Sequence, residues 1–172
     1  MQRRSHQEVQ IEPVLDTVQM AEVARLASLI WRECYAGIVS SEQIDFMLKN
    51  FQSERAIAEQ IQRGYRYFQL SRGMEILGYF AIQPQAEGRL FLSKIYLKVG
   101  ERGKGYGRKM MTFIERWAER EGYSEVTLTV NKQNNRAIRA YENMGFRIAE
   151  SIIQDIGEGF VMDDYGMTKR LS

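Results

Sequence analysis

The sequence predicts an α+β fold, a mixed β-sheet with helices packed on it. Segments with apolar residues at helical spacing are interspersed with short apolar or aromatic segments that read as strands, and this order is typical of a layered α+β domain. The length of 172 residues fits a single domain over residues 1–172. The apolar fraction of 44% and the charged fraction of 27% are globular values, which exclude a disordered chain.

The first third of the chain predicts one strand and three helices. Residues 9–15 alternate loosely between apolar and polar, which indicates a strand. Asp16 can cap the helix that follows, and Ser40 with Gln43 three positions later is typical of a capping box before the second helix. The third helix is short and ends at Gly64. By these signals the helices occupy residues 17–35, 40–51 and 53–63.

The rest of the chain predicts six strands and two helices. A hairpin turns at Arg72-Gly73, and a turn at Gly88 leads into a long strand with apolar residues in odd positions from Phe91 to Val99. Two amphipathic helices follow, each ended by a glycine. The strands are predicted at residues 65–70, 75–82, 90–99, 125–130, 146–155 and 160–169, and the helical stripes at 110–118 and 137–144.

Charge and residue counts exclude several classes of protein. The chain has 24 Lys and Arg against 22 Asp and Glu, and this net charge of +2 is too small for a general nucleic-acid-binding protein. The only cysteine, Cys34, can form no intrachain disulfide. His6 is the only histidine, so the sequence predicts no metal site of the Cys/His type. No segment has the ~20 apolar residues of a membrane helix, and no signal peptide precedes the first strand. We therefore expect a cytoplasmic protein that binds neither membrane nor nucleic acid, with residues 1–8 as a flexible tail.

A glycine-rich stretch between a strand and a helix favours an anion site. Residues 101–109 carry four cations and one glutamate, and three glycines between them let backbone N–H groups face one concavity. The start of the helix adds unpaired donors and a partial positive charge. The stretch lacks the Lys-Ser/Thr of a P-loop and the third glycine of a dinucleotide-binding loop. Taken alone, it leaves open both a phosphate site and a turn that only needs flexible φ angles.

A second stretch, about 25 residues further on, resolves this choice. An apolar strand ends at Val130, and Asn134 or Asn135 caps a helix that carries Tyr141. Taken alone, Tyr141 fits a core aromatic residue better than a catalyst. The two stretches together resemble the GCN5-related N-acetyltransferase (GNAT) superfamily. The matching residues are Arg102-Gly103-Lys104-Gly105-Tyr106-Gly107 for its acyl-CoA signature and Asn134, Ala137, Tyr141, Gly145 and Phe146 for its second motif.

The resemblance implies a fold and a cosubstrate. The sheet is expected to be mostly antiparallel and flanked by helices on both faces, with a splayed parallel strand pair that holds acyl-CoA. Acetyl-CoA is the expected cosubstrate, without a metal. The implied cofactor-binding residues are Ile95, Tyr96 and Leu97 for pantetheine, Arg102, Gly103, Lys104, Gly105, Tyr106, Gly107 and Arg108 for pyrophosphate, and Asn134, Ala137 and Tyr141 from the second motif.

The resemblance also implies catalytic roles. Amine attack on a thioester creates an oxyanion, which the backbone N–H at Leu97 can stabilise. Tyr141 matches the position that protonates the departing CoA thiolate. Cys34 is not needed, because the amine can attack acetyl-CoA directly. Some relatives place a glutamate base about four residues before Leu97, where this sequence has Ser93 and Lys94, so a water chain or another carboxylate is expected to take the proton.

The site for the acetyl acceptor, which we call the acceptor side, is predicted to be formed by the end of the first helix and by the last two strands. Glu33 and Tyr35 are its polar groups on the helix. The acidic residues of those strands and their connection are Asp155, Glu158, Asp163 and Asp164. A solvated acidic turn and an acidic funnel for a cationic amine both remain open, and the segment loosely resembles bacterial polyamine acetyltransferases. We predict an N-acetyltransferase acting on a small primary amine, as a monomer or homodimer. The alternatives are a protein N-terminal or lysine acetyltransferase and a CoA-binding module without catalysis.

Overall fold

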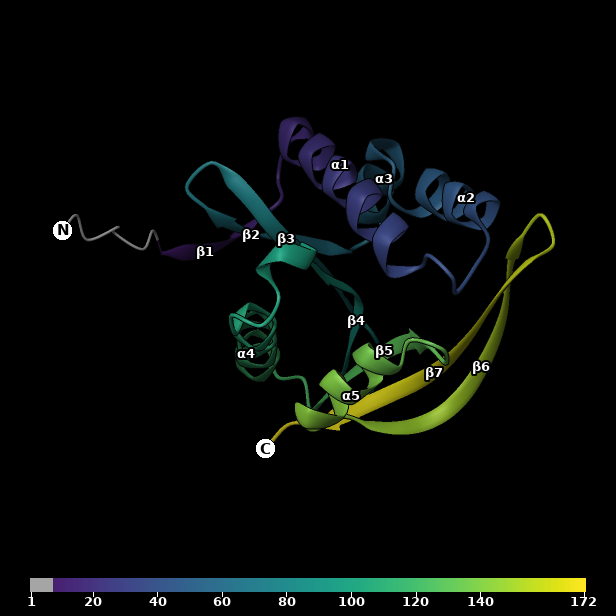
Figure 1. Ribbon diagram of the computed structural model, residues 1–172. Helices are drawn as coiled ribbons and strands as arrows, with labels where there is room; N and C mark the ends of the chain where they lie inside the picture. Colours follow the sequence, from purple (N-terminus) through teal and green to yellow (C-terminus); the bar gives the residue numbers. More distant parts are fainter. Residues whose placement is uncertain (1–7) are drawn as a thin grey trace.

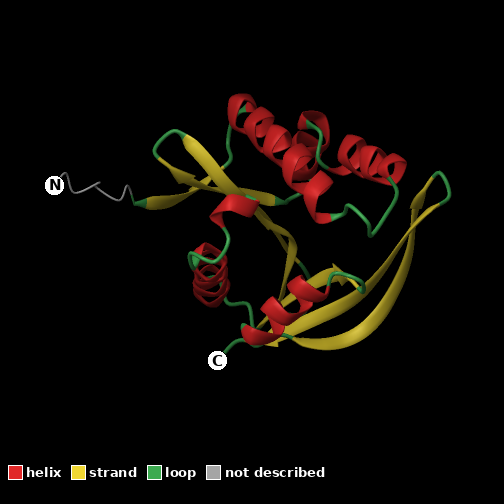
Figure 2. Cartoon of the chain, in the orientation of Figure 1, coloured by secondary structure: helices red, strands yellow, loops and turns green. Residues whose placement is uncertain are grey.

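One seven-stranded sheet organises the structure, a computed structural model that describes residues 8–172 (Figures 1 and 2). Residues 1–7, nearly all of the expected tail, lie outside the described residues. The strand order is β1-β2-β3-β4-β5-β7-β6, and β4 and β5 form the one parallel pair among the described strands. The predicted α+β fold with a mostly antiparallel sheet is therefore confirmed. The strands are β1 Val9–Pro13, β2 Arg66–Arg72, β3 Glu75–Pro84, β4 Arg89–Leu97, β5 Glu125–Asn131, β6 Arg147–Gly157 and β7 Phe160–Arg170.

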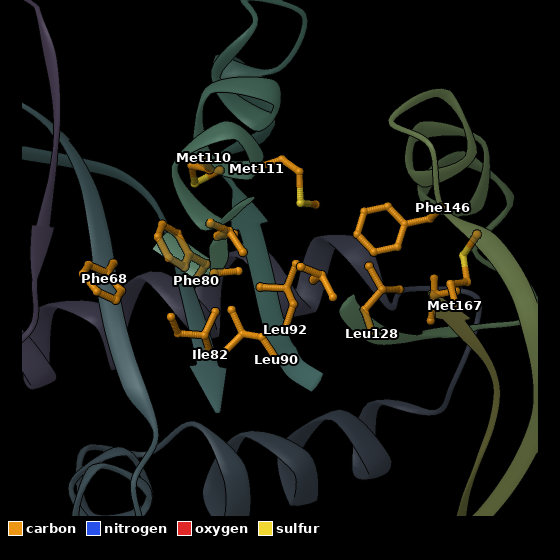
Figure 3. Packing of buried hydrophobic residues seen from close by; sticks show 14 of the residues in the cluster. Phe68, Phe80, Ile82, Leu90, Leu92, Met110, Met111, Leu128, Phe146 and Met167 are labelled. Carbon is orange, nitrogen blue, oxygen red and sulfur yellow. The ribbon is translucent and has the colours of Figure 1, made fainter. Parts of the chain in front are cut away.

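Helices cover both faces of this sheet, as predicted. On one face lie α1 Thr17–Cys34, α2 Ser41–Phe51 and α3 Glu54–Gln62, and on the other lie α4 Tyr106–Arg120 and α5 Asn135–Asn143 (Figure 1). Aromatic and aliphatic side chains fill the space on each side. The layer that includes Phe68 and Phe80 packs under α4 and α5, where Met110 and Phe146 contact it (Figure 3). None of the helices in the described part of the chain is long and apolar enough to cross a membrane.

The predicted N-caps Asp16 and Ser40 are confirmed, but the capping box forms at a different helix from the predicted one. Asp16 forms a full capping box with Gln19, whose side chain accepts from the Asp16 backbone N–H. The predicted box at Ser40 is only half formed, because Gln43 donates its side-chain N–H to the Val161 carbonyl of β7 at 3.0 Å. That hydrogen bond ties α2 to the last hairpin instead of closing the helix end.

A bulge in β4 changes which side chains share a face. Between two successive residues of β3 the partner in β4 moves from Lys94 to Leu92, so Ser93 is an extra residue. An extra residue shifts the alternation of a strand by one, and Ile95 and Leu97 therefore pack into the same cluster as Leu92. The regular alternation expected for this strand is interrupted, and β4 ends two residues earlier than predicted.

The parallel pair separates directly beside the bulge. β4 and β5 pair from Arg89 with Glu125 up to Leu92 with Leu128, and no pairing follows. β4 continues on its other side as a partner of β3 as far as Leu97. The separation leaves the last residues of β4 facing a gap, which is the splayed geometry that the resemblance implies.

Candidate active site

A cleft of about 410 Å³ opens where β4 and β5 separate. It is lined by the end of α1, the end of β4, the following loop, the end of β5 and the exposed side of α5. The sequence-predicted residues that line it are Glu33, Tyr35, Ile95, Tyr96, Leu97, Arg102, Gly103, Gly107, Asn134, Ala137 and Tyr141. Segments separated by about a hundred residues thus meet in one cavity.

Other predicted residues lie elsewhere. Gly105 and Arg108 line a groove on the opposite flank of α4, while Tyr106 packs against the core. The ammonium group of Lys104 lies 3.0 Å from a carboxylate oxygen of Glu101. Asp163 lines a small pocket beside α2, outside the cleft. The glycine-rich loop therefore divides its residues between two surfaces.

A nearly buried carboxylate, that of Glu101, fixes the position of the glycine-rich loop. Glu101, in the short 3₁₀ turn Val99–Glu101, accepts hydrogen bonds from Arg72 of β2 at 3.0 and 3.2 Å. The hydrogen bonds from Arg72 and then Lys104 keep the pKa of Glu101 below its usual value. Arg102 points the other way and donates to the Cys34 Sγ at 3.0 Å. The loop is thus tied both to the β2–β3 hairpin and to the end of α1.

The main chain of the cleft offers free hydrogen-bonding groups. Lys98 donates its backbone N–H to the Leu77 carbonyl of β3 at 2.9 Å. Backbone N–H groups alternate in direction along a strand, so those of Ile95 and Leu97 point towards the gap. At the helix opposite, Asn134 caps α5 by accepting from the Ala137 N–H at 3.3 Å, which fixes the start of that helix at the cleft.

Three tyrosines meet in the cleft. The hydroxyl oxygens of Tyr35 and Tyr96 are 3.1 Å apart and share a hydrogen bond, and the Trp31 ring packs on both tyrosines. Burial raises the pKa of Tyr35 to about 12, and burial also raises the pKa values of Tyr96 and Tyr141. All three phenols are therefore protonated at neutral pH.

Two adjacent acids of β7 have different surroundings. Asp163 is 56% exposed and its carboxylate lies 2.7 Å from the Lys132 ammonium. Asp164 is partly buried, and its Oδ1 is shielded from solvent without a hydrogen-bond partner in the described part of the chain. Burial raises the pKa of Asp164 to about 6, and the charge of Asp163 adds to the increase. Asp164 is close enough to Tyr35 for its charge to raise the tyrosine's pKa, although it does not line the cleft itself.

The remaining acids of the last hairpin do not gather at the cleft. Asp155 lies near the tip of the β6–β7 hairpin, where its side chain accepts from the Gly157 N–H at 2.8 Å, and Glu158 forms the turn. Closeness in sequence therefore does not bring the four acids together, because an extended strand advances about 3.4 Å per residue.

Lys94 and Ser93 occupy positions away from the cleft. The Lys94 ammonium hydrogen-bonds the side chains of Gln60 and Ser93 and lies 5.4 Å from the centre of the Tyr65 ring. Burial lowers the pKa of Lys94 to about 8. The expectation that the base lies elsewhere on the chain remains a prediction.

Sequence reasoning missed several lining residues, namely Thr129, Asn131, Arg136, Ala140 and Met144. Arg136, Ala140 and Met144 lie within the second motif, on the side of α5 that carries Ala137 and Tyr141, so helical periodicity could have found them. Thr129 and Asn131 can be recognised as cleft residues only when it is known where the pairing between β4 and β5 ends.

Comparison with known proteins finds similar acetyltransferases. The model of the acetyltransferase (GNAT) family matches residues 24–146. The chain is 27% identical to a spermidine N(1)-acetyltransferase of Thermoplasma acidophilum over 160 residues, which cover 86% of this chain and 90% of the relative. It is 36% identical to a streptothricin acetyltransferase of Streptomyces lavendulae over 73 residues, 42% of this chain and 39% of that protein.

The fold is also similar to solved structures. The PaiA N-acetyltransferase of Thermoplasma acidophilum, in complex with coenzyme A, matches with a TM-score of 0.80 at 21% identity, over 95% of this chain and 99% of that one. The predicted superfamily is confirmed, because the family match spans more than half of the chain. The chain belongs to the acetyltransferase (GNAT) family and is an acyl-CoA-dependent N-acetyltransferase.

Proposed function

We propose that this enzyme transfers an acetyl group from acetyl-CoA directly to a primary amine of a small cationic acceptor of the polyamine type. The observation that carries the proposal is the cleft, in which unpaired main chain of β4 faces Tyr141 and a glycine-rich loop on one side and Tyr35 on the other. The similarity to a spermidine acetyltransferase supports a polyamine acceptor.

The donor side of the cleft consists of the end of β4 (Ile95 to Leu97), the loop residues Arg102 and Gly103, Gly107 at the start of α4, and Asn134 and Ala137. The free N–H and C=O groups of β4 fit the amides of a pantetheine chain, as an added strand would. Backbone N–H groups of the loop and the start of α4 fit a pyrophosphate, because a helix N-terminus favours anions. Arg102 and Gly103 line the cleft at this end and supply a cation and a close backbone approach.

Bound acetyl-CoA supplies an activated acetyl group. The Leu97 N–H points into the gap and can stabilise the negative charge that forms on the carbonyl oxygen. Tyr141, which stays protonated at neutral pH, can donate its proton to the leaving thiolate. Cys34 takes no covalent part, since the amine reaches the thioester carbon directly.

The acceptor side consists of Glu33 and Tyr35, which line the cleft, and of Asp164, which lies near Tyr35 but outside the lining. An alkylamine with a pKa near ~10.4 arrives charged, so Glu33 and Asp164 attract it and the Tyr35 ring can contact the ammonium group. The amine must lose a proton before it attacks. Asp164 is the proposed base and acts through a water, because it does not line the cleft. Its Oδ1 has no hydrogen-bond partner among residues 8–172, and its raised pKa of about 6 leaves it ionised at neutral pH yet able to take a proton. Asp163 contributes through its charge, as its carboxylate is paired with Lys132.

The test is a panel of amine acceptors assayed by release of free CoA. The panel holds spermidine, spermine, a monoamine of equal length, an amino sugar and a lysine-containing peptide. We expect kcat/KM for the two polyamines to exceed that for the monoamine at least tenfold, and the KM for spermidine to rise with salt because screening weakens the attraction. A preference for the peptide would identify a protein acetyltransferase, and acetyl-CoA binding without turnover on any amine would leave only a CoA-binding module.

A further inference from the structure

A second cavity lies outside the active-site cleft, on the opposite flank of α4. This groove, of about 540 Å³, runs between α4 and the edge strand β1, and we call it the α4–β1 groove. Its floor is apolar, formed by the half-buried side chains of Ile11, Phe113 and Trp117. Its rim carries the exposed cations Arg108, Lys109, Arg116 and Arg120. A hollow of this size with an apolar floor falls within the range of ligand sites.

The rim cations have no acidic partner within the part of the chain that the structure describes. Among residues 8–172, none of the four forms an ion pair with a carboxylate. Lys109 instead donates weakly to the Val9 carbonyl of β1, at 3.5 Å. Of the two glutamates on α4, Glu115 pairs with Lys169, and neither it nor Glu119 lines the groove. Residues 1–7 contain no acidic residue either, so the groove's positive charge calls for an external anion.

The free edge of β1 indicates what form that anion takes. β1 ends the sheet and pairs with β2 but with no other described strand, so its outer N–H and C=O groups have no strand partner. An exposed sheet edge is a template for an added strand. The groove runs alongside β1. Val9, at the start of β1, contacts Lys109 near the start of α4. Arg66, at the start of the antiparallel partner β2, lies 5.5 Å from the centre of the Trp117 ring near the end of α4.

We propose that the α4–β1 groove binds an extended acidic peptide segment of a partner protein, which adds to the sheet beside β1 and places alternate acidic and apolar side chains against α4. The groove follows α4 from Gly105 to Arg120, about 22 Å at 1.5 Å per residue, which matches roughly six to seven residues of extended chain. A second copy of this chain does not fit, since two such grooves face to face would bring like charges together. A nucleic acid would satisfy the cations but not the strand edge.

The test is isothermal titration with an eight-residue probe in which Glu and Leu alternate at the positions that face α4, with Thr at the positions between. We expect the wild type to bind it, and Arg116→Glu with Arg120→Glu to weaken binding at least tenfold, which is about 1.4 kcal/mol. The matched control reverses two exposed arginines of α3 and its end, Arg55→Glu with Arg63→Glu, and keeps the affinity within twofold. Circular dichroism checks that both double variants fold.

Further probes separate the contributions of charge and strand edge without changing the protein. A probe with Lys in place of Glu should not bind, and N-methylation of alternate amides that face β1 should abolish binding of the acidic probe. Equal affinity for the N-methylated probe would overturn strand addition. Tighter binding of single-stranded DNA or of phosphatidylserine vesicles, or stoichiometric displacement of the probe by acetyl-CoA, would overturn the peptide site. None of these measurements uses acetyl transfer, so their failure leaves the proposed function intact.

Discussion

The proposed donor and acceptor sides of the cleft differ in the groups that form them. The donor side is largely main chain, namely the end of β4, the glycine-rich loop and the start of α5. The proposed acceptor side depends on the side chains of Glu33 and Tyr35, which line the cleft at the end of α1, and of Asp164 on β7, which lies near Tyr35 outside the lining. A main-chain site needs glycines and a strand that loses its partner, whereas a side-chain site needs distant residues to be brought together by the whole fold.

Because of this difference, the two sides tolerate different kinds of amino-acid substitution. Main-chain donors survive most substitutions, because every residue except proline carries an N–H, and only a change in space or backbone angle removes them. Side-chain groups are removed by a single substitution. We therefore expect substitutions on the acceptor side to change turnover and its pH dependence, and steric changes on the donor side to change acetyl-CoA affinity.

Tyr141 stands between the two sides, and its replacement is expected to have the largest effect. Tyr141→Phe keeps the packing of the ring against Phe146 and removes the proton donor. General acid catalysis contributes about 10²–10⁴-fold, so kcat should fall by that factor while the Kd for acetyl-CoA stays within about twofold. Tyr123→Phe, whose ring stacks on Trp117 outside the cleft, is the matched control. An unchanged kcat would make Tyr141 a packing residue.

Asp164→Asn tests the acceptor side. The proposed base works only when it is ionised, and with a pKa of about 6 it gains its charge as the pH rises through that value. The kcat/KM of the wild type for spermidine should therefore rise with a limb near pH 6. The variant should lose about 10²-fold and lose this limb, as a pH series of initial rates would measure. Retention of the limb in the variant would assign it to another group.

The neighbouring acid sharpens this comparison. The charge of Asp163 helps to raise the pKa of Asp164, so Asp163→Asn should move the acid limb to lower pH without removing it. The same pH series measures the shift. An effect of Asp163→Asn as large as that of Asp164→Asn would mean that the two acids act as one group.

The two sides also differ in how far the sequence predicts them. The proposed donor side comes from short patterned stretches, so two motifs were enough to place Arg102, Gly103, Gly107 and Asn134 at one cleft. Helical and strand periodicity likewise gave the order of the elements. The bulge at Ser93 could not be predicted, because it follows from register with β3 rather than from any local signal.

On the acceptor side, the sequence could not show that the adjacent residues Asp163 and Asp164 have different surroundings. Asp163 and Asp164 point to opposite faces of β7, as successive residues of a strand do, and only the surroundings of each face distinguish them. Lys132 pairs with Asp163, while Asp164 is partly buried and close enough to Tyr35 to affect its pKa. These two residues directly follow β5 and α1, and no sequence pattern links such distant segments.

Gly107→Val tests the donor side and is expected to have a smaller effect. Gly107 lies in the first turn of α4 and lines the cleft, and a Cβ there meets no atom within 4 Å, so the fold can accept a side chain. The side chain would then occupy the space for the pyrophosphate and raise the Kd for acetyl-CoA about tenfold, or roughly 1.4 kcal/mol. The control is Gly100→Val, which is equally open but outside the cleft. Titration calorimetry that finds equal affinity for both variants would contradict the assignment of the loop.

The smallest expected effect is on stability, and it again contrasts the two sides. The pKa of Asp164 is raised by burial to about 6, so the folded state holds the proton more tightly than the unfolded state does. The ionised carboxylate therefore destabilises the fold, and this cost grows as the pH rises from about 4 to 6 and then stays constant.

Asp164→Asn removes that cost while it removes the proposed base. Because the side chain is only partly buried, we expect a gain of about 1 kcal/mol, or roughly 2–4 °C in Tm. The gain should be largest at pH 8, smaller at pH 5 and absent below pH 4, as thermal unfolding by circular dichroism can measure. Gly107→Val, on the donor side, offers no such gain at any pH. A Tm of Asp164→Asn that is unchanged or lowered at pH 8 would show that the carboxylate has a stabilising partner in the folded state.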